Sequence, residues 1–288
     1  MIDHSYSDQV LELSFTRLAK KRGSFSNPPR SLSDYVSELI NNPDTVFLYD
    51  KTCLFASASI DMWERAIHSF LWSVAITKQS PIWSSTLGYY SSHYSMRAFA
   101  HAFGFFKSFV EGKAVQITIE KSQPAFKILQ EKNKGEHPFY WKVVKEYPEF
   151  SKHPLFKLNG DRDPSSESAH RNHANYADNL NNFRKFDLPK EEEFEKHISS
   201  VTSKRISETE LIIHRDKFPI NLINVQILAY QRIVTFRDFL DRHISKNQFW
   251  MVRKTPSWCK LDFNIEDELS SIARESLVSK SITREFFS

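Results

Sequence analysis

Two stretches that are each long enough for a buried helix meet at Ser80 and Pro81, and this break constrains the fold more than any other feature. One stretch covers residues 53–79 and the other residues 80–111, with no further proline until Pro124. Serine is a favoured N-cap, and proline is favoured at the first helical position because its missing N–H is not needed there. We therefore expect two antiparallel helices joined by a tight turn.

The second stretch is rich in aromatic and small residues and is predicted to form a helix from Ser80 to Glu111. Ser95, Ala98 and Ala102 recur at helical spacing and form a smooth strip. Small side chains let two helix backbones approach closely. We expect another helix to pack on this strip, so that the stretch becomes the core helix of the protein.

The rest of the chain favours a mainly α fold. Among 288 residues only 6 are glycine, and apolar residues recur with helical period along most of the sequence. The clearest alternation is at residues 114–121, which predicts a strand. A long helix with a continuous apolar stripe is expected from Pro219 to about Ser245.

Three segments follow from these patterns. Residues 1–50 form an N-terminal helical extension, in which Ser31 and Asp34 have the spacing of a capping box. Residues 51–246 form the main bundle, with a β or irregular insertion at about 113–164. Residues 247–288 contain a C-terminal aromatic segment and a last helix.

Charge and composition exclude several classes of protein. The net charge is +4, from 39 basic and 35 acidic residues, which is too small for a polybasic arm. The two cysteines are far apart and form no metal-binding spacing. No apolar run approaches the length of about 20 residues that a membrane span requires. We expect a soluble cytoplasmic protein with no membrane partner, no metal and no cofactor.

Polar side chains gather in residues 168–182 beyond what a solvated helix face needs. Asparagine is a poor helix former because its side chain competes for backbone hydrogen bonds, so a helix this rich in it needs another reason to exist. Two readings stay open at this point: a chemical site, or a buried hydrogen-bond network that fastens the bundle. The segment contains His170, Arg171, Asn172, His173, Asn175, Tyr176, Asp178 and Asn179.

The run from Ser92 to Ala102, SHYSMRAFAHA, followed by RNHANY at Arg171 to Tyr176 and a last long amphipathic helix, resembles the HEPN superfamily of helical bundles. The resemblance covers roughly Cys53 to Ser245. It implies a HEPN-like antiparallel helical bundle with a small β or irregular insertion and extra terminal helices. The family includes metal-independent ribonucleases, many of them toxins or antiviral effectors, and inactive members that bind or scaffold.

The resemblance also implies roles for residues. Arg171 and Asn172 would lie at the phosphate, with His170 or His173 as the base that activates a ribose 2′-hydroxyl. In active members four to six residues separate the arginine from the histidine; in this chain that spacing falls on residues 176–178, which include no histidine. Further binding residues are expected at Asn175, Tyr176, His93, His101, Arg184 and Lys185. His93 or His101, both on the aromatic helix that starts at Ser80, is a candidate to replace the histidine that the polar segment lacks.

A basic rim beside this segment is a further expectation. It would comprise Arg184, Lys185, Lys204, Arg205, Arg232, Arg237 and Arg242, with Phe183 or Trp250 available to stack on bases.

These observations predict a HEPN-like, RNA-directed protein of a toxin–antitoxin or antiviral defence system, which would be an endoribonuclease if active. The expected partners are RNA and a second copy of the chain or another protein. The alternative is a catalytically inactive HEPN-like scaffold that dimerises or docks on a partner protein. A third hypothesis, from outside the family, is a helical adaptor with no nucleic-acid role.

Overall fold

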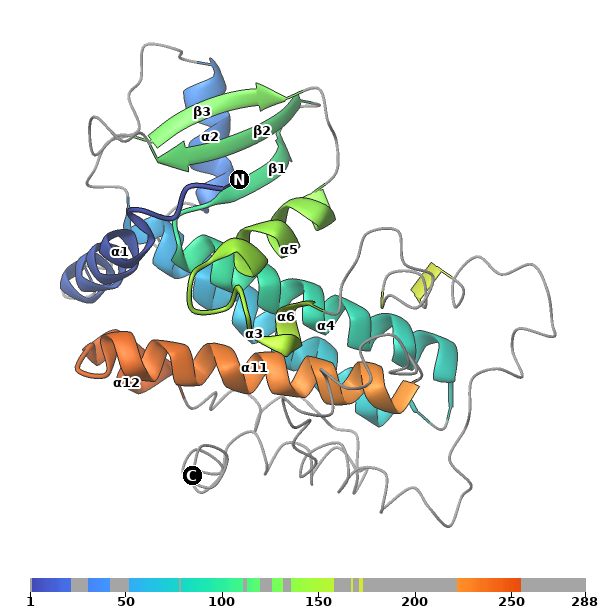
Figure 1. Ribbon diagram of the computed structural model, residues 1–288. Helices are drawn as coiled ribbons and strands as arrows, with labels where there is room; N and C mark the ends of the chain where they lie inside the picture. The colour runs from blue at the N-terminus through green and yellow to red at the C-terminus, as the bar shows by residue number, and fades with distance from the viewer. Residues whose placement is uncertain are drawn as a thin grey trace. The chain divides into compact units, whose positions relative to one another are not determined.

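The computed structural model describes a mainly α protein with a small antiparallel sheet (Figure 1). The chain divides into two compact units. The first unit comprises Met1–Trp63, Met96–Ser151 and Phe239–Lys254, and the described residues of the second belong to Glu64–Ser95 and Lys152–Asp238. The described residues are 2–21, 31–41, 52–77, 79–110, 113–119, 126–131, 136–157, 167, 171–172 and 222–254.

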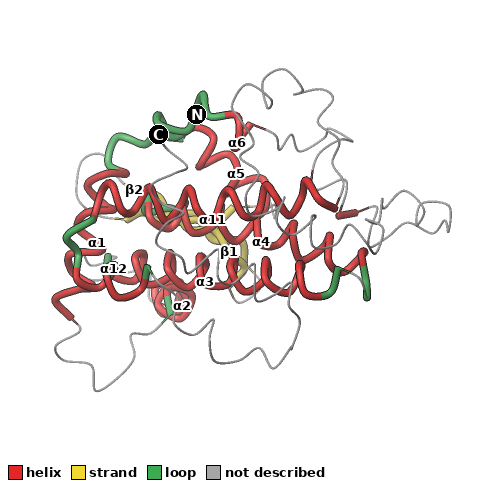
Figure 2. Tube along the Cα trace, turned by 90° about the horizontal axis from the view of Figure 1, so that it is seen from below, coloured by secondary structure: helices red, strands yellow, loops and turns green. Residues whose placement is uncertain are grey.

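Helices α3 (Cys53–Ala75) and α4 (Pro81–Ala102) form the expected antiparallel pair, and they run alongside each other in Figure 2. The backbone N–H of Ser84 donates to the carbonyl of Ser80 at 2.9 Å, so Pro81 occupies the first helical position as the sequence predicts. The turn between the two helices is therefore set by the local sequence.

Small residues spaced by seven positions line the contact between α3 and α4. In the first unit, the Ser59 hydroxyl donates to the carbonyl oxygen of Ala98 at 2.7 Å. In the second unit, Ser91 donates in the same way to Ala66 at 2.7 Å, and Ser84 to Ser73 at 2.5 Å. A hydroxyl can reach a carbonyl of the facing helix only where the backbones are close, so the small residues determine the packing distance. We call this contact the serine seam.

Helix α11 (Leu222–Ile244) packs on this pair within the second unit. The Gln226 amide nitrogen lies 3.0 Å from the hydroxyls of Thr77 and Ser84 and 3.1 Å from the Ser73 carbonyl, all of them buried. These contacts provide partners for polar groups that would be costly to bury alone. The buried amide therefore joins α3, α4 and α11.

Helix α4 ends earlier than the sequence predicts. It stops at Ala102, and the segment to Glu111 that was expected to be helical turns into strand β1 (Phe106–Val110). Gly104 has φ of 86°, the N–H of Gly104 donates to His101 and that of Phe105 to Ala100. This is a Schellman motif, and only glycine adopts its left-handed position without strain. The β insertion consequently starts before residue 113.

The sheet has the order β1-β2-β3, with β2 (Lys113–Ile119) and β3 (Phe126–Glu131) both antiparallel to their neighbours. The strand expected at residues 114–121 is thus confirmed. Helix α2 (Leu32–Asn41) covers one face, where its apolar residues share a core with Phe106, Val115 and Ile117. The predicted capping box of α2 is also confirmed, since Asp34 and Ser31 bond reciprocally at 3.1 and 3.2 Å.

Helix α5 (Glu136–Glu146) packs beside the edge strand β1. The Tyr140 hydroxyl donates to the carbonyl of Lys107 at 2.5 Å and accepts from its N–H at 3.0 Å. One buried side chain therefore satisfies both backbone groups of this edge residue, which protects that point from pairing with another strand.

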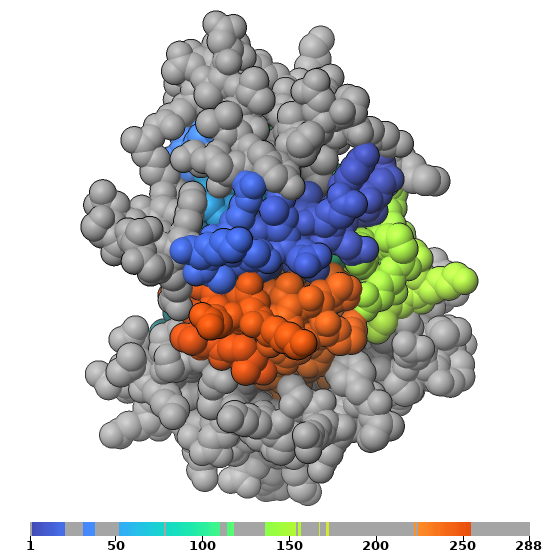
Figure 3. Space-filling view, turned by 90° about the vertical axis from the view of Figure 1, so that its left-hand side faces the viewer, coloured from blue at the N-terminus to red at the C-terminus, as the bar shows by residue number. Residues whose placement is uncertain are grey.

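Helices α1 (Ser7–Lys21) and α12 (Gln248–Arg253) lie against each other in the first unit, as the space-filling view shows in blue and orange (Figure 3). Trp250 of α12 is fully buried, with its ring centroid 5.5 Å from that of Trp63. The short helix α6 (Pro154–Lys157) belongs to the second unit. None of the described helices combines the length and apolar character of a membrane span.

Replacement of Gly88 by alanine tests the close packing on α4. A Cβ at this position would lie 2.8 Å from Cγ1 of Val225 and 3.3 Å from Oγ of Ser73. Valine has little freedom to move aside. We expect Gly88→Ala to lower the free energy of unfolding by about 1–3 kcal/mol, although alanine favours a helix by about 1 kcal/mol.

Urea denaturation of Gly88→Ala, Val225→Ala and the double variant measures this effect. The loss caused by Gly88→Ala should be smaller in the Val225→Ala background, because the clashing methyl group is gone. An unchanged or increased stability of Gly88→Ala would contradict the close approach of α11.

Candidate functional site

A fully buried ion pair lies in the second unit, at the residue that precedes the polar segment. Glu167, whose backbone is helical, lies 2.7 Å from Nη1 of Arg232 on α11, and both side chains are 0% exposed. Arg232 also donates to the Ser92 hydroxyl at 2.8 Å and to the Leu155 carbonyl at 3.0 Å. A buried pair is stable only where such additional hydrogen bonds offset desolvation. Arg232 thus connects Glu167 with α4 and α6.

Arg171 follows Glu167 by four residues in the sequence, and its own backbone is helical. Its guanidinium carbon lies 4.9 Å from the ring centroid of Tyr89 and 6.0 Å from that of Tyr90. Nη1 is 3.5 Å from the Tyr90 hydroxyl, and Nη2 donates to Oδ1 of Asn172. Cation–π contacts of this kind contribute about 0.5–2 kcal/mol, so the tyrosines orient the guanidinium.

Arg171 differs in its electrostatic environment from three described arginines that form ion pairs. Arg97 pairs with Glu136 at 2.8 Å, Arg232 with Glu167, and Arg242 with Glu149. Within the described residues no carboxylate pairs with Arg171, which is half-buried beside the exposed Asn172. The described groups around its guanidinium are therefore neutral: two tyrosines and an asparagine.

His93 lies in the same cluster but is only 2% exposed. Its ring is parallel to that of Tyr89, with a centroid distance of 6.4 Å and an interplanar angle of 3°. Tyr89 is therefore a shared neighbour of His93 and of the guanidinium of Arg171. The structure brings the two predicted residues together, but it buries the histidine.

His101 belongs to the first unit and is 1% exposed. Its Nδ1 lies 2.9 Å from the carbonyl oxygen of Phe105, and its ring packs against Phe106 and Tyr140. Burial, with a further contribution from nearby Arg97, lowers the pKa of His101 to about 3. The imidazole is therefore neutral at physiological pH and inaccessible to a substrate in this conformation.

Several predicted positions lie outside the described residues: His170, His173, Asn175, Tyr176, Phe183, Arg184, Lys185, Lys204, Arg205 and the helix opened by Asn264. Of the expected basic rim, Arg232 and Arg237 are buried and Arg242 pairs with Glu149, so these three form no open basic surface. Trp250 is buried in the core of the first unit and has no free face on which a base could stack.

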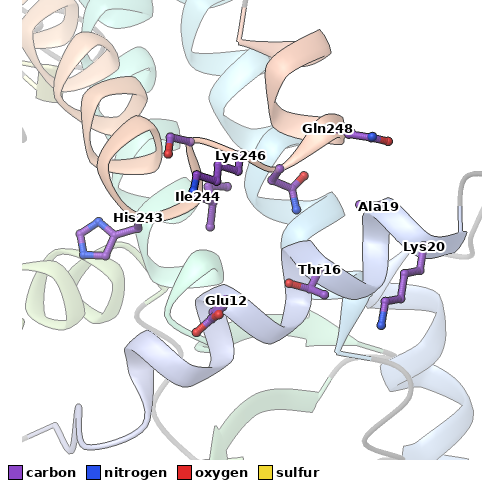
Figure 4. A pocket seen from close by; sticks show the side chains of 10 residues that line it. Glu12, Thr16, Ala19, Lys20, His243, Ile244, Lys246 and Gln248 are labelled. Carbon is purple, nitrogen blue, oxygen red and sulfur yellow. The ribbon is translucent and has the colours of Figure 1, made fainter.

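A polar cavity of about 620 Å³ lies elsewhere, in the first unit, between α1 and the turn from α11 to α12 (Figure 4). Acidic and basic groups both line it, so it has no clear charge preference. The described residues that line it include none of the predicted site residues. They are Glu12, Thr16, Ala19, Lys20, His243, Ile244, Ser245, Lys246, Asn247 and Gln248.

Comparison with known protein families, curated proteins and solved structures gives no match. Within the described residues, no group of three or more His, Cys, Asp or Glu side chains is arranged to hold a metal ion. The candidate site is therefore defined by its own geometry: Arg171 lies over Tyr89 and Tyr90 and bonds to Asn172, with the buried pair of Glu167 and Arg232 in the same unit.

Removal of one partner of the buried ion pair should be strongly destabilising. Glu167→Leu or Arg232→Met alone leaves an uncompensated buried charge, and we expect a loss of about 3–5 kcal/mol in the free energy of unfolding. The double variant should be more stable than either single variant, because no charge remains buried.

Chemical denaturation of the three variants measures these free energies of unfolding. Glu149→Gln, at the exposed ion pair with Arg242, is the control, and its free energy of unfolding should fall by less than about 1 kcal/mol. A double variant that is no more stable than both single variants would show that the charge pairing is not the stabilising interaction.

The burial of His101 predicts a pH dependence of stability. The folded state keeps the imidazole neutral down to a pKa of about 3, whereas an unfolded chain protonates it near pH 6.5. Its contribution to the free energy of unfolding is therefore complete above pH 6.5 and declines as the pH falls from 6.5 towards 3.

An NMR titration of the His101 ring should show no protonation between pH 8 and 5. The loss of stability over this range should be smaller in His101→Gln, which lacks the titrating group. Protonation of His101 near pH 6.5 in the folded protein would contradict its burial.

Proposed function

We propose that this chain is a HEPN-like, RNA-directed protein in which Arg171 and Asn172 contact an RNA phosphate. The observation that carries this proposal is the state of Arg171: a cation without a described carboxylate partner, stacked near Tyr89 and Tyr90, and half-exposed. An arginine whose only role was structural would be expected to have its charge balanced, as in the pair of Arg232 and Glu167.

The geometry suits recognition of a phosphate. Arg171 has two described hydrogen-bond partners, Tyr90 and Asn172. Tyr90 uses one terminal nitrogen of the guanidinium, and Asn172 uses the other. Each of these nitrogens carries a second N–H, and arginine binds phosphate through such paired donors. The tyrosines and Asn172 fix the guanidinium plane, so less side-chain entropy is lost when the anion binds.

Ribonuclease activity would also require a base that reaches a ribose hydroxyl. His93 shares the neighbour Tyr89 with Arg171, but its burial does not suit proton transfer to a bound substrate. His170 or His173 is therefore the base in this proposal. The burial of His93 favours the second candidate function, a catalytically inactive scaffold that dimerises or docks on a partner protein.

The effect of Arg171→Ala on RNA binding tests the proposal. The protein is incubated with fluorescently labelled RNA in EDTA, so that metal-dependent nucleases are silent. Loss of a charge-assisted contact should weaken binding by about 10- to 100-fold, from a contribution of roughly 1.5–3 kcal/mol. Arg242→Ala is the matched control, since this exposed arginine is paired with Glu149, and it should bind RNA like the wild type.

The same samples separate catalysis from binding. Cleavage that is lost in Arg171→Ala and in His170→Ala or His173→Ala supports a metal-independent ribonuclease. Binding without cleavage supports an RNA-directed protein that is catalytically inactive. If the wild type neither binds nor cleaves RNA, the proposal is wrong and the scaffold becomes the better hypothesis.

A further inference from the structure

Helix α4 presents an outward row of apolar and aromatic side chains beside Arg171. Trp83, Leu87, Tyr90 and Tyr94 follow one another at intervals of four, three and four residues, which keeps them on one face of a helix. The serine seam lies on a different face of α4, through Ser84 and Ser91. We call the outward row the aromatic stripe. All four residues belong to the second unit, as does Arg171.

The aromatic stripe is exposed where it begins. Trp83 is 60% exposed, and Leu87, Tyr90 and Tyr94 are half-buried. Trp83 thus leaves more than half of its surface in water, where a flat ligand group can stack on the ring. The rings of Tyr90 and Tyr94 are 6.2 Å apart, so the stripe presents neighbouring aromatic surfaces rather than one isolated ring.

The position of Arg171 gives the stripe its chemical preference. The guanidinium lies beside Tyr90, about two helical turns or roughly 10 Å along the axis from Trp83. Aromatic rings next to an unneutralised cation complement a ligand that has flat, unpaired bases and a charged backbone. Single-stranded nucleic acid combines these features, and its bases stack on exposed aromatic side chains, whereas the bases of a duplex are not accessible to them.

We infer that the aromatic stripe binds single-stranded RNA, with a base stacked on Trp83 while a phosphate of the same strand contacts Arg171. This inference rests on the proposed function and specifies its substrate class: unpaired rather than duplex RNA. It also assigns base stacking to Trp83, in place of the buried Trp250.

Binding of a labelled RNA of about 12 nucleotides without self-complementarity, and of the same sequence annealed as a duplex, tests the inference. Trp83→Ala should weaken single-strand binding by about 5- to 100-fold and leave duplex binding unchanged. Trp83→Phe should retain most of the affinity, because it keeps an aromatic ring. Phe109→Ala is the control for an exposed aromatic residue, since Phe109 is 44% exposed on β1 of the first unit.

The outcomes distinguish this inference from the proposed function. If Arg171→Ala weakens RNA binding and Trp83→Ala does not, the stripe is not the stacking surface, while the phosphate contact stands. If neither residue affects binding, both proposals fail. Sedimentation of the wild type and Trp83→Ala detects the alternative occupant: self-association that depends on Trp83 would overturn the RNA assignment in favour of a second copy of the chain.

Discussion

The hydroxyl-to-carbonyl contacts of the serine seam set the distance between α3 and α4, and the remaining contacts of the second unit depend on this distance. Where the two helices are this close, Gly88 leaves room for Val225, and the Gln226 amide reaches the polar groups of both helices. Larger residues in the seam would separate the backbones and leave these buried polar groups without partners. The seam is thus a condition for the docking of α11.

The position of α11 in turn determines the candidate site. Arg232 reaches Ser92 of α4 and Glu167, the residue before the polar segment, and Arg171 lies over the ring of Tyr89 in the same unit. The part of the serine seam that lies in the second unit therefore shares this packed unit with Arg171. Arg171 has no carboxylate partner among the described residues.

Local patterns predicted much of the fold because they act over a few residues. Ser80 with Pro81, Ser31 with Asp34, and the alternation in β2 each determine the backbone directly. The end of α4 was missed although Gly104 marks it, because the phenylalanines around this glycine suit a helix and a strand equally well. A glycine followed by a bulky apolar residue at the end of a helical stretch is the pattern that could have located the Schellman motif.

The site was predictable only in part, because the missing information concerns long-range contacts. The unusual asparagine content led to Arg171 and Asn172, but the pairing of Glu167 with Arg232 joins residues 65 positions apart. The sequence does contain one indication: Arg232 interrupts the apolar stripe of α11, and a charge in such a place requires a buried partner. The burial of His93 and Trp250 was not predictable, since it depends on which helix faces are covered.

The salt dependence of RNA binding tests the contact between Arg171 and phosphate most directly. For a single strand, the slope of log affinity against log salt concentration changes by about 0.7 for each neutralised phosphate. We predict that the slope for Arg171→Ala is shallower than that for the wild type by about this amount. An equal slope for the two proteins would contradict the assignment of Arg171 to a phosphate.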